Sequence, residues 1–164
     1  MRFELLSRNH DRTQFDCGSE PLNLYLQTTA RKHMDRGISK TFVLVNPNGT
    51  TILGYLTLSA AEINKSELPV EIAKRMPKTL GIVLLGRLAV DKSYQGKGIG
   101  LVLLHEAVTK TVHAAENIGI CGMMVKAKDA KAAAFYEHYG FQRGEKDNHL
   151  LFLPITTLRK ILAV

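Results

Sequence analysis

The stretch Gln95-Gly96-Lys97-Gly98-Ile99-Gly100 decides the fold of this 164-residue chain. It lies between an apolar run, residues 82–90, and a leucine-rich segment that begins at Ile99. That order predicts a strand, a glycine loop and a helix. Glycines let a backbone approach a ligand closely, and a helix N-terminus offers free N–H groups and a positive dipole end to an anion. The stretch therefore predicts a site for a phosphate or pyrophosphate, although a plain glycine turn is the alternative.

Two familiar nucleotide motifs do not match this loop. The Walker motif fails because Gly98 is followed by Ile99 instead of a Lys-Ser/Thr pair, and the dinucleotide motif G-x-G-x-x-G fails because position 101 is leucine. What is left is the pattern Q-x-x-G-x-G, with the positive charge of Lys97 inside the loop.

Length and composition predict one cytoplasmic domain over residues 1–164. The two cysteines argue against a disulfide framework or a zinc ribbon, and no apolar run approaches the ~20 residues of a membrane span. The formal net charge of +7 is compatible with ordinary solubility, or with a polyanionic partner such as a nucleotide, a nucleic acid or an acidic protein.

Hydrophobic periodicity and turn residues predict a chain of alternating strands and helices. Strands are expected over residues 3–7, 41–45, 52–61, 82–90, 120–126 and 150–153, and helices over residues 19–37, 68–76, 99–117 and 129–138, with a short basic helix at the end. We expect Ser19 to cap the first helix and the strand 82–90 to be buried on both faces. An antiparallel hairpin and a later parallel crossover predict a mixed sheet.

Two segments resemble the signatures of the GNAT-fold N-acetyltransferases. Leu88-Ala89-Val90-Asp91, followed by residues 95–100, resembles the acetyl-CoA motif, and Ala134-Phe135-Tyr136-Glu137-His138-Tyr139-Gly140-Phe141 resembles the second signature. The resemblance implies an α/β fold with a mixed central sheet, whose strands splay and are flanked by helices. It implies acetyl-CoA as co-substrate, bound by Leu88, Ala89, Val90, Gln95, Gly96, Lys97, Gly98, Ile99, Gly100 and Phe135, with Leu88 and Val90 contributing backbone groups to the pantetheine arm.

A narrower resemblance covers nearly the whole chain. Phe15-Asp16-Cys17-Gly18, Gly86-Arg87-Leu88-Ala89-Val90-Asp91 and Ala115-Glu116-Asn117-Ile118-Gly119 are similar to segments of the GNAT toxins of type II toxin–antitoxin systems. Members of that family acetylate the α-amine of an aminoacyl-tRNA and so halt translation. The resemblance implies a ribbon-helix-helix antitoxin, promoter DNA bound by the toxin–antitoxin complex, and a homodimer.

Tyr136 is the candidate catalytic residue, because a phenol of pKa ~10 can donate a proton or hydrogen bond to a leaving CoA thiolate. The alternative is a packed aromatic side chain, which is the role that we expect of Tyr139. The strand 82–90 has no carboxylate to act as a general base and carries Arg87 instead. An α-amine of pKa ~7.7–8.0 needs less help to lose a proton than a lysine of ~10.4, so the missing base favours an α-amine substrate. Glu62, acting through water, is a weaker candidate base.

Other charged residues have more than one interpretation. Arg87 is expected either to contact an RNA phosphate or to pair with a local acid. A phosphate-binding rim or a solvated surface is expected of Arg31, Lys32, Arg36, Lys74, Arg75 and Lys78. The histidines and cysteines have no metal-binding spacing, so no metal is expected. A housekeeping GNAT that acetylates a small amine or a protein N-terminus, and a non-catalytic acetyl-CoA-binding or DNA-binding protein, are the competing functions.

Overall fold

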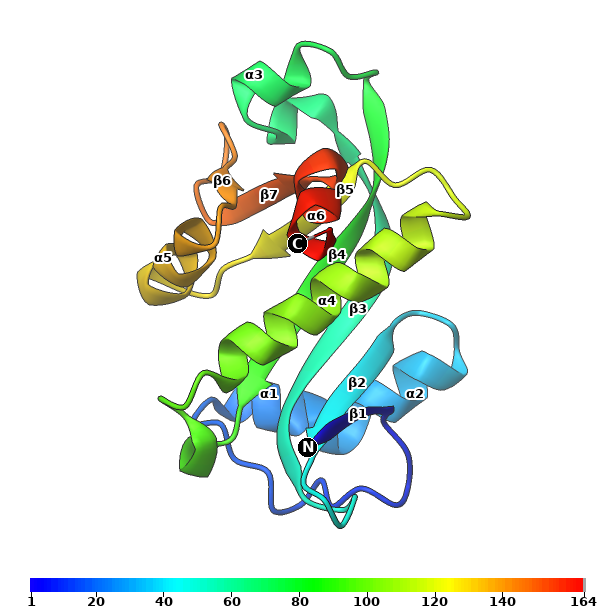
Figure 1. Cartoon of the computed structure of the whole chain (residues 1–164), viewed down its shortest axis with the longest axis vertical. Helices are drawn as coiled ribbons and strands as arrows, with labels where there is room; N and C mark the ends of the chain where they lie inside the picture. Colours follow the sequence, from blue (N-terminus) through cyan, green and yellow to red (C-terminus); the bar gives the residue numbers. More distant parts are fainter. Residues whose placement is uncertain (164) are drawn as a thin grey trace. The chain divides into compact units, whose positions relative to one another are not determined.

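We describe residues 1–163 of the chain in a computed structural model (Figure 1). Val164, the last residue of the predicted domain, lies outside them. The elements follow in the order β1 (Arg2–Leu5), α1 (Glu20–Leu24), η1 (Tyr25–Thr29), α2 (Ala30–Asp35), β2 (Lys40–Val45), β3 (Ile52–Asn64), η2 (Lys65–Glu67), α3 (Val70–Ala73), β4 (Thr79–Val90), η3 (Lys92–Tyr94), α4 (Ile99–Ala115), β5 (Gly122–Lys126), α5 (Ala130–His138), β6 (Gln142–Arg143), β7 (Leu150–Pro154) and α6 (Ile155–Leu162).

The strands form one mixed sheet with the order β1-β2-β3-β4-β5-β7-β6. β2 and β3 pair antiparallel across the predicted hairpin, and β4 and β5 pair parallel across α4. Both features confirm the predicted connections, since a short turn can only reverse the chain whereas a parallel partner needs a crossover helix. The two-residue strand β6, which pairs with β7, was not predicted because it is too short to show alternation.

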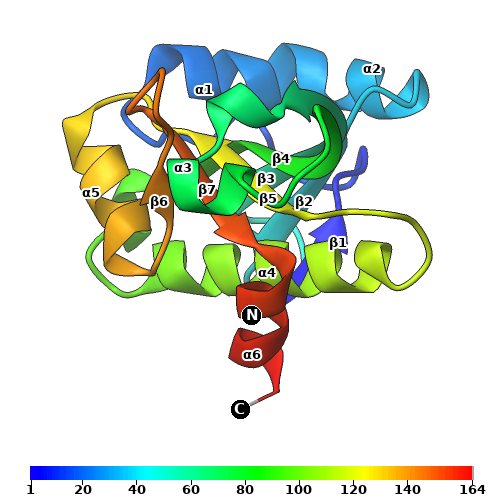
Figure 2. The same ribbon diagram turned by 90° about the horizontal axis from the view of Figure 1, so that it is seen from above.

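The chain divides into two compact units, and β3, β4 and α4 each contribute residues to both. The first unit contains residues Met1–Ser59 and Gly86–Ala107, and the second contains Ala60–Leu85 and Val108–Val164. In the first unit, α1 and α2 cover one face of the strands and the start of α4 covers the other (Figure 2). Its core on the α1 side includes Tyr25, Leu26, Tyr55 and Ala89.

The second unit has a core of its own. Leu68, Leu80, Ile82, Met124 and Phe152 pack together there and bury β4, β5 and β7 against the segment around α3. α5 packs on β7, and α6 contacts both β5 and β7.

The first helical region departs from the predicted single helix over residues 19–37. A π-helical segment, η1, interrupts it between α1 and α2, and its five residues begin with the buried Tyr25. Ser19 stands at the N-cap position with an extended backbone, but its side chain makes no capping hydrogen bond, so the predicted cap is wrong. The Asn23 amide donates to the Ser19 carbonyl at 3.0 Å, which is the ordinary backbone hydrogen bond of a first helical turn. Gly37 has a φ of 71° just after α2, as predicted for a residue that ends a helix.

Candidate functional site

The glycine loop has the backbone conformation of an anion-binding turn. Gly96 and Gly98 have φ values of 76° and 80°, a left-handed region that side chains with a Cβ rarely adopt. No heavy atom lies within 4 Å of the position that a Cβ would take at either residue, so the space beside the loop is open. The 17-residue helix α4 begins directly afterwards at Ile99. Alternating left-handed residues and a helix N-terminus together turn N–H groups toward one side, which suits a pyrophosphate.

Gln95 holds the start of this loop against two neighbouring segments. Its side-chain amide donates one hydrogen bond to the Val90 carbonyl at 2.9 Å and one to the Cys17 carbonyl at 3.0 Å. The first acceptor is the end of β4, and the second belongs to the Phe15-Asp16-Cys17-Gly18 segment. One side chain therefore joins the loop, the strand before it and a distant segment of the chain.

Asp16 strengthens the same connection. Its carboxylate accepts hydrogen bonds from the Gly18 amide at 2.9 Å and from the Asn23 side chain at 3.0 Å, and its other oxygen lies 3.1 Å from the Lys92 ammonium. The Asp16 amide in turn donates to the Asp91 carboxylate at 3.1 Å. The hydrogen bond from Asn23, followed by those from Gly18 and Lys92, lowers the pKa of Asp16 from 3.8 to about 2. Asp16 is therefore charged at neutral pH and holds its segment against η3.

Lys97 is exposed, and its ammonium lies 5.5 Å from the centroid of the Tyr94 ring, within cation–π range. In the structure the side chain lies beside the loop, where its charge can add to that of the backbone amides.

The end of β4, residues Leu88, Ala89 and Val90, leads directly into this loop. The parallel ladder joins Val83, Leu84 and Leu85 to β5, and Gly86–Val90 lies beyond these pairs. Ala89 is buried, whereas Leu88 and Val90 are only partly covered, so the prediction of a strand buried on both faces is wrong here. Side chains alternate along a strand, and Gly86, with no side chain, leaves the face of Leu88 and Val90 more open.

Arg87 points to the opposite face of β4, with Ala89. Its guanidinium carbon lies 3.4 Å from the centroid of the Tyr25 ring, so the cation sits directly on the aromatic face. The pair brings together β4 and the start of the π-helical segment. Of the two expectations for Arg87, pairing with a local acid is wrong, because no carboxylate among residues 1–163 forms an ion pair with it.

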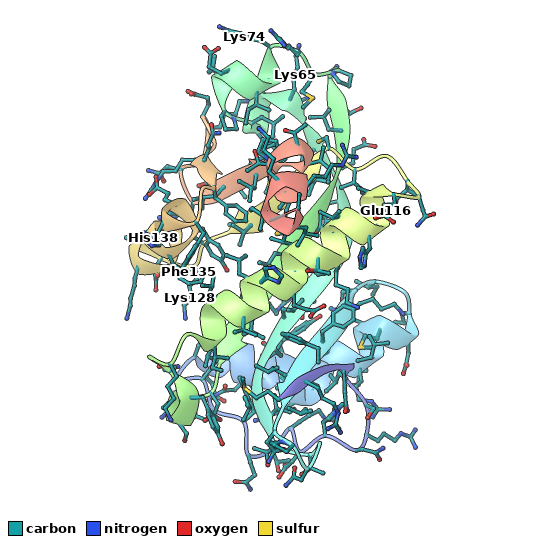
Figure 3. All side chains as sticks on the ribbon, viewed as in Figure 1. Lys65, Lys74, Glu116, Lys128, Phe135 and His138 are labelled. Carbon is teal, nitrogen blue, oxygen red and sulfur yellow. The ribbon has the colours of Figure 1, made fainter. Side chains whose placement is uncertain are left out.

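Tyr136 and Phe135 lie on α5 in the second unit, and Figure 3 shows Phe135 and His138 on this helix. Asp129 caps α5 by accepting a hydrogen bond from the Ala132 amide at 2.8 Å. The Tyr136 ring makes edge-to-face contacts with Phe135 and Phe141, at centroid distances of 5.2 Å and 5.5 Å. The packed-aromatic description thus holds for the Tyr136 ring, while Tyr139 is less buried and makes an edge-to-face contact with Phe135.

The Tyr136 hydroxyl is the unusual part of this cluster. The residue is 6 % exposed, and burial raises the pKa of its phenol above the ordinary value of 10. The hydroxyl forms no hydrogen bond with residues 1–163. No fully buried polar side-chain atom of these residues lacks a partner, so the hydroxyl is not fully buried. It is therefore protonated at neutral pH and available to a ligand.

The remaining candidates are placed as follows. Glu62 is exposed on β3. Lys32 and Arg36 are exposed on or just after α2, in the first unit, and Arg31 is partly covered. Lys74, which pairs with Glu71 at 3.0 Å and follows α3 (Figure 3), belongs with Arg75 and Lys78 to the second unit.

In the part of the chain that the structure describes, no three His, Cys, Asp or Glu side chains are grouped to hold a metal ion. None of the helices formed by residues 1–163 is long and apolar enough to cross a membrane.

The sequence analysis missed the roles of Asp16, Gln95 and Tyr25 in this arrangement. An aspartate two residues before a glycine is the signature of an Asx turn, and that signal was present in Asp16-Cys17-Gly18. Nothing local marks Tyr25 as the partner of Arg87, because the contact depends on the tertiary fold.

The family comparison agrees with this geometry. Residues 38–143 match the model of the acetyltransferase (GNAT) domain. A tRNA-acetylating toxin of Mycobacterium tuberculosis (strain ATCC 25618 / H37Rv) is 33% identical over 90% of this chain and 89% of its own length. A probable toxin TacT of Sinorhizobium fredii (strain NBRC 101917 / NGR234) is 26% identical over 93% of this chain and 90% of its own.

Solved structures of similar proteins contain several ligands. AtaT complexed with acetyl-methionyl-tRNAfMet has a TM-score of 0.91 at 32% identity and covers 98% of each chain. A Tyr→Phe variant of AtaT, bound to the C-terminus of the antitoxin AtaR and to acetyl-CoA, has a TM-score of 0.85 at 30% identity, over 99% of this chain and 98% of that one. The AtaT–AtaR complex bound to DNA has a TM-score of 0.81 at 30% identity, over 99% of each chain.

The predicted fold and enzyme class are thereby confirmed. The chain is an acetyl-CoA-dependent acetyltransferase that belongs to the GNAT family, in the branch that contains the tRNA-acetylating toxins.

Proposed function

We propose that this protein is the toxin of a type II toxin–antitoxin system and transfers the acetyl group of acetyl-CoA to the α-amine of an aminoacyl-tRNA. The similarity to a tRNA-acetylating toxin over nine-tenths of the chain carries this proposal. The glycine loop supports it, because its left-handed glycines leave open space in front of a helix N-terminus, as a CoA pyrophosphate requires.

In the proposed site, the pyrophosphate binds the amides of Gln95, Gly96, Lys97, Gly98, Ile99 and Gly100. The backbone at Leu88, Ala89 and Val90 pairs with the pantetheine arm as a peptide pairs with a sheet edge. The ladder to β5 does not include these three residues, which leaves their backbone groups available on that side. Phe135 adds an apolar surface at the cofactor.

The proposed reaction joins the amine nitrogen to the acetyl carbon and breaks the bond from that carbon to sulfur. The amine loses a proton to solvent, which is easier for an aminoacyl ester than for lysine because the ester's amine is the weaker base. The CoA sulfur leaves as a thiolate and accepts a hydrogen bond from the Tyr136 hydroxyl. A thiol of pKa ~8.5 is a stronger acid than a phenol whose pKa burial has raised, so Tyr136 acts chiefly by donating this hydrogen bond.

The structures of AtaT also support a set of partners for this protein. AtaT has been solved with the C-terminus of AtaR and with AtaR on DNA. We infer that this chain is neutralised by an antitoxin, of the ribbon-helix-helix class implied by the sequence resemblance, and that the complex binds promoter DNA. We place the active homodimer in the cytoplasm, where charged tRNA is found.

The test is transfer of labelled acetyl from acetyl-CoA to bulk charged tRNA by the purified protein. We expect label on charged tRNA and none on tRNA that has been deacylated beforehand. Label on polyamines or protein N-termini with none on tRNA would replace the proposal by a housekeeping acetyltransferase. No turnover with any amine would replace it by a binding protein.

A further inference from the structure

Arg87 is a cation with an unused set of donors at the end of β4. A guanidinium carries five N–H donors in one plane, and stacking on an aromatic ring leaves its edges free. The guanidinium carbon of Arg87 lies 3.4 Å from the centroid of the Tyr25 ring, and the guanidinium forms no hydrogen bond or ion pair with residues 1–163. The side chain is only partly exposed, so its orientation is set by packing more than by solvent.

Tyr25 is itself fixed in place. The ring is 6 % exposed, and the hydroxyl lies 3.1 Å from Ser39 Oγ and 3.1 Å from His33 Nδ1. It stands at the first position of the π-helical segment, a rare conformation that often occurs at functional sites. The Tyr25 ring is therefore held in place beneath the Arg87 guanidinium.

The chemistry of Arg87 selects an anion with several oxygens. The planar N–H donors of a guanidinium match the oxygens of a phosphate or carboxylate. No carboxylate of residues 1–163 forms an ion pair with Arg87. Arg87 also precedes Leu88 in the chain, and the strand turns these two side chains to opposite faces. The guanidinium of Arg87 therefore offers its donors to a ligand on the Tyr25 side of the end of β4.

We propose that Arg87, supported by Tyr25, binds a backbone phosphate near the aminoacylated 3′ end of the acceptor tRNA. The contact orients the ester so that its α-amine faces the thioester. This inference rests on the proposed function and names a substrate-binding residue for it. Arg87 is then a binding residue and Tyr25 a positioning residue.

The test compares two substrates that differ in phosphate. Arg87→Gln is assayed on a charged tRNA and on a 3′-aminoacyl-adenosine, which carries the same ester without any phosphate. We expect kcat/KM on charged tRNA to fall about ten- to a hundredfold, the scale of a hydrogen bond to a charged group, with little change on the aminoacyl-adenosine. Arg159→Gln, which removes an exposed positive charge on α6, is the matched control and is expected to change neither.

Binding gives a second readout that does not depend on turnover of the small substrate. The logarithm of the tRNA affinity falls with the logarithm of salt concentration, and loss of one phosphate contact lowers that slope by about one. We expect this loss in Arg87→Gln. Tyr25→Leu, which removes the aromatic ring beneath Arg87, should lose part of the tRNA affinity. The double variant Tyr25→Leu/Arg87→Gln should bind tRNA little more weakly than Arg87→Gln alone. Tyr25→Phe keeps the ring and should retain most of the affinity.

Equal losses on both substrates with an unchanged slope would show that Arg87 is only a packing residue and would overturn the proposal. So would an effect confined to antitoxin binding, because the partner of Arg87 would then be an acidic peptide. A wild-type protein that acetylates no charged tRNA would refute the proposed function instead. An active wild type whose Arg87→Gln variant keeps its tRNA kinetics and slope would refute only the role of Arg87.

Discussion

The glycine loop and the α5 aromatic cluster are held in place by opposite means. The loop is exposed and is fixed by polar contacts, since Gln95 bonds two carbonyls and Asp16 ties the neighbouring segment to Lys92. Tyr136 is buried and is fixed by two aromatic neighbours, with no hydrogen bond of its hydroxyl to residues 1–163. The difference fits the two tasks that we propose, because binding an anion needs many rigid backbone donors while stabilising a leaving group needs one donor free of other partners.

The largest effect is expected from Tyr136→Phe. The exchange keeps the ring contacts and removes only the hydroxyl, so the fold should be retained while kcat falls about a hundredfold, the lower range for a general acid. The measurement is turnover at saturating acetyl-CoA and charged tRNA. Tyr139→Phe is the matched control on the same helix and should keep most of the activity. Wild-type turnover by Tyr136→Phe would remove Tyr136 from the mechanism.

The next effect is expected from Gly98→Ala. Its φ of 80° becomes strained once a Cβ is present, at a cost of about 1–3 kcal/mol, although no neighbouring atom would clash. We expect the KM for acetyl-CoA to rise about tenfold, whether the loop keeps its strained conformation or relaxes into another one. Gly119→Ala is the control, because its surroundings are equally open and its φ is not in the left-handed region. An unchanged KM in Gly98→Ala would argue against a pyrophosphate at this loop.

A smaller effect is expected from Gln95→Ala. Two hydrogen bonds to backbone carbonyls are lost, each worth about 0.5–1.5 kcal/mol, but the side chain is exposed and water replaces part of them. We expect a rise of about three- to tenfold in the KM for acetyl-CoA with kcat nearly constant. Gln142→Ala, at an exposed glutamine of β6, should leave both constants alone. If kcat fell instead of affinity, Gln95 would belong to the chemistry and not to the loop's support.

How much of the fold and of the candidate site was predictable depends on the separation in sequence between the residues of each contact. The loop and α4 were predicted because glycines, an apolar run and a leucine-rich segment are adjacent in sequence. Tyr136 was proposed from its motif, and its catalytic role stays a prediction. The bond from Gln95 to Cys17 spans 78 residues, and the Arg87–Tyr25 contact depends on a π-helical turn that periodicity does not report. Contacts of this kind are set by tertiary packing, which overrides local preference.

The smallest effect is expected from pH at Asp16. Its pKa is lowered from 3.8 to about 2 in the fold, so the charged form stabilises the native state above about pH 4, and this contribution is lost as pH falls toward 2. Unfolding by urea, measured from pH 5 to pH 2 for wild type and Asp16→Asn, should show a stability difference that shrinks over this window. A difference that stays constant down to pH 2 would mean that the charge of Asp16 contributes nothing.

The central claim, that one region binds acetyl-CoA and the other assists the leaving thiolate, is tested most directly by measuring two quantities for two variants. The dissociation constant of acetyl-CoA and the single-turnover rate at saturation are determined for Tyr136→Phe and Gly98→Ala beside wild type. We predict that Tyr136→Phe keeps the dissociation constant and loses the rate, while Gly98→Ala weakens binding and keeps the rate once saturated. The claim would be contradicted if Tyr136→Phe weakened binding as much as Gly98→Ala and kept the wild-type rate.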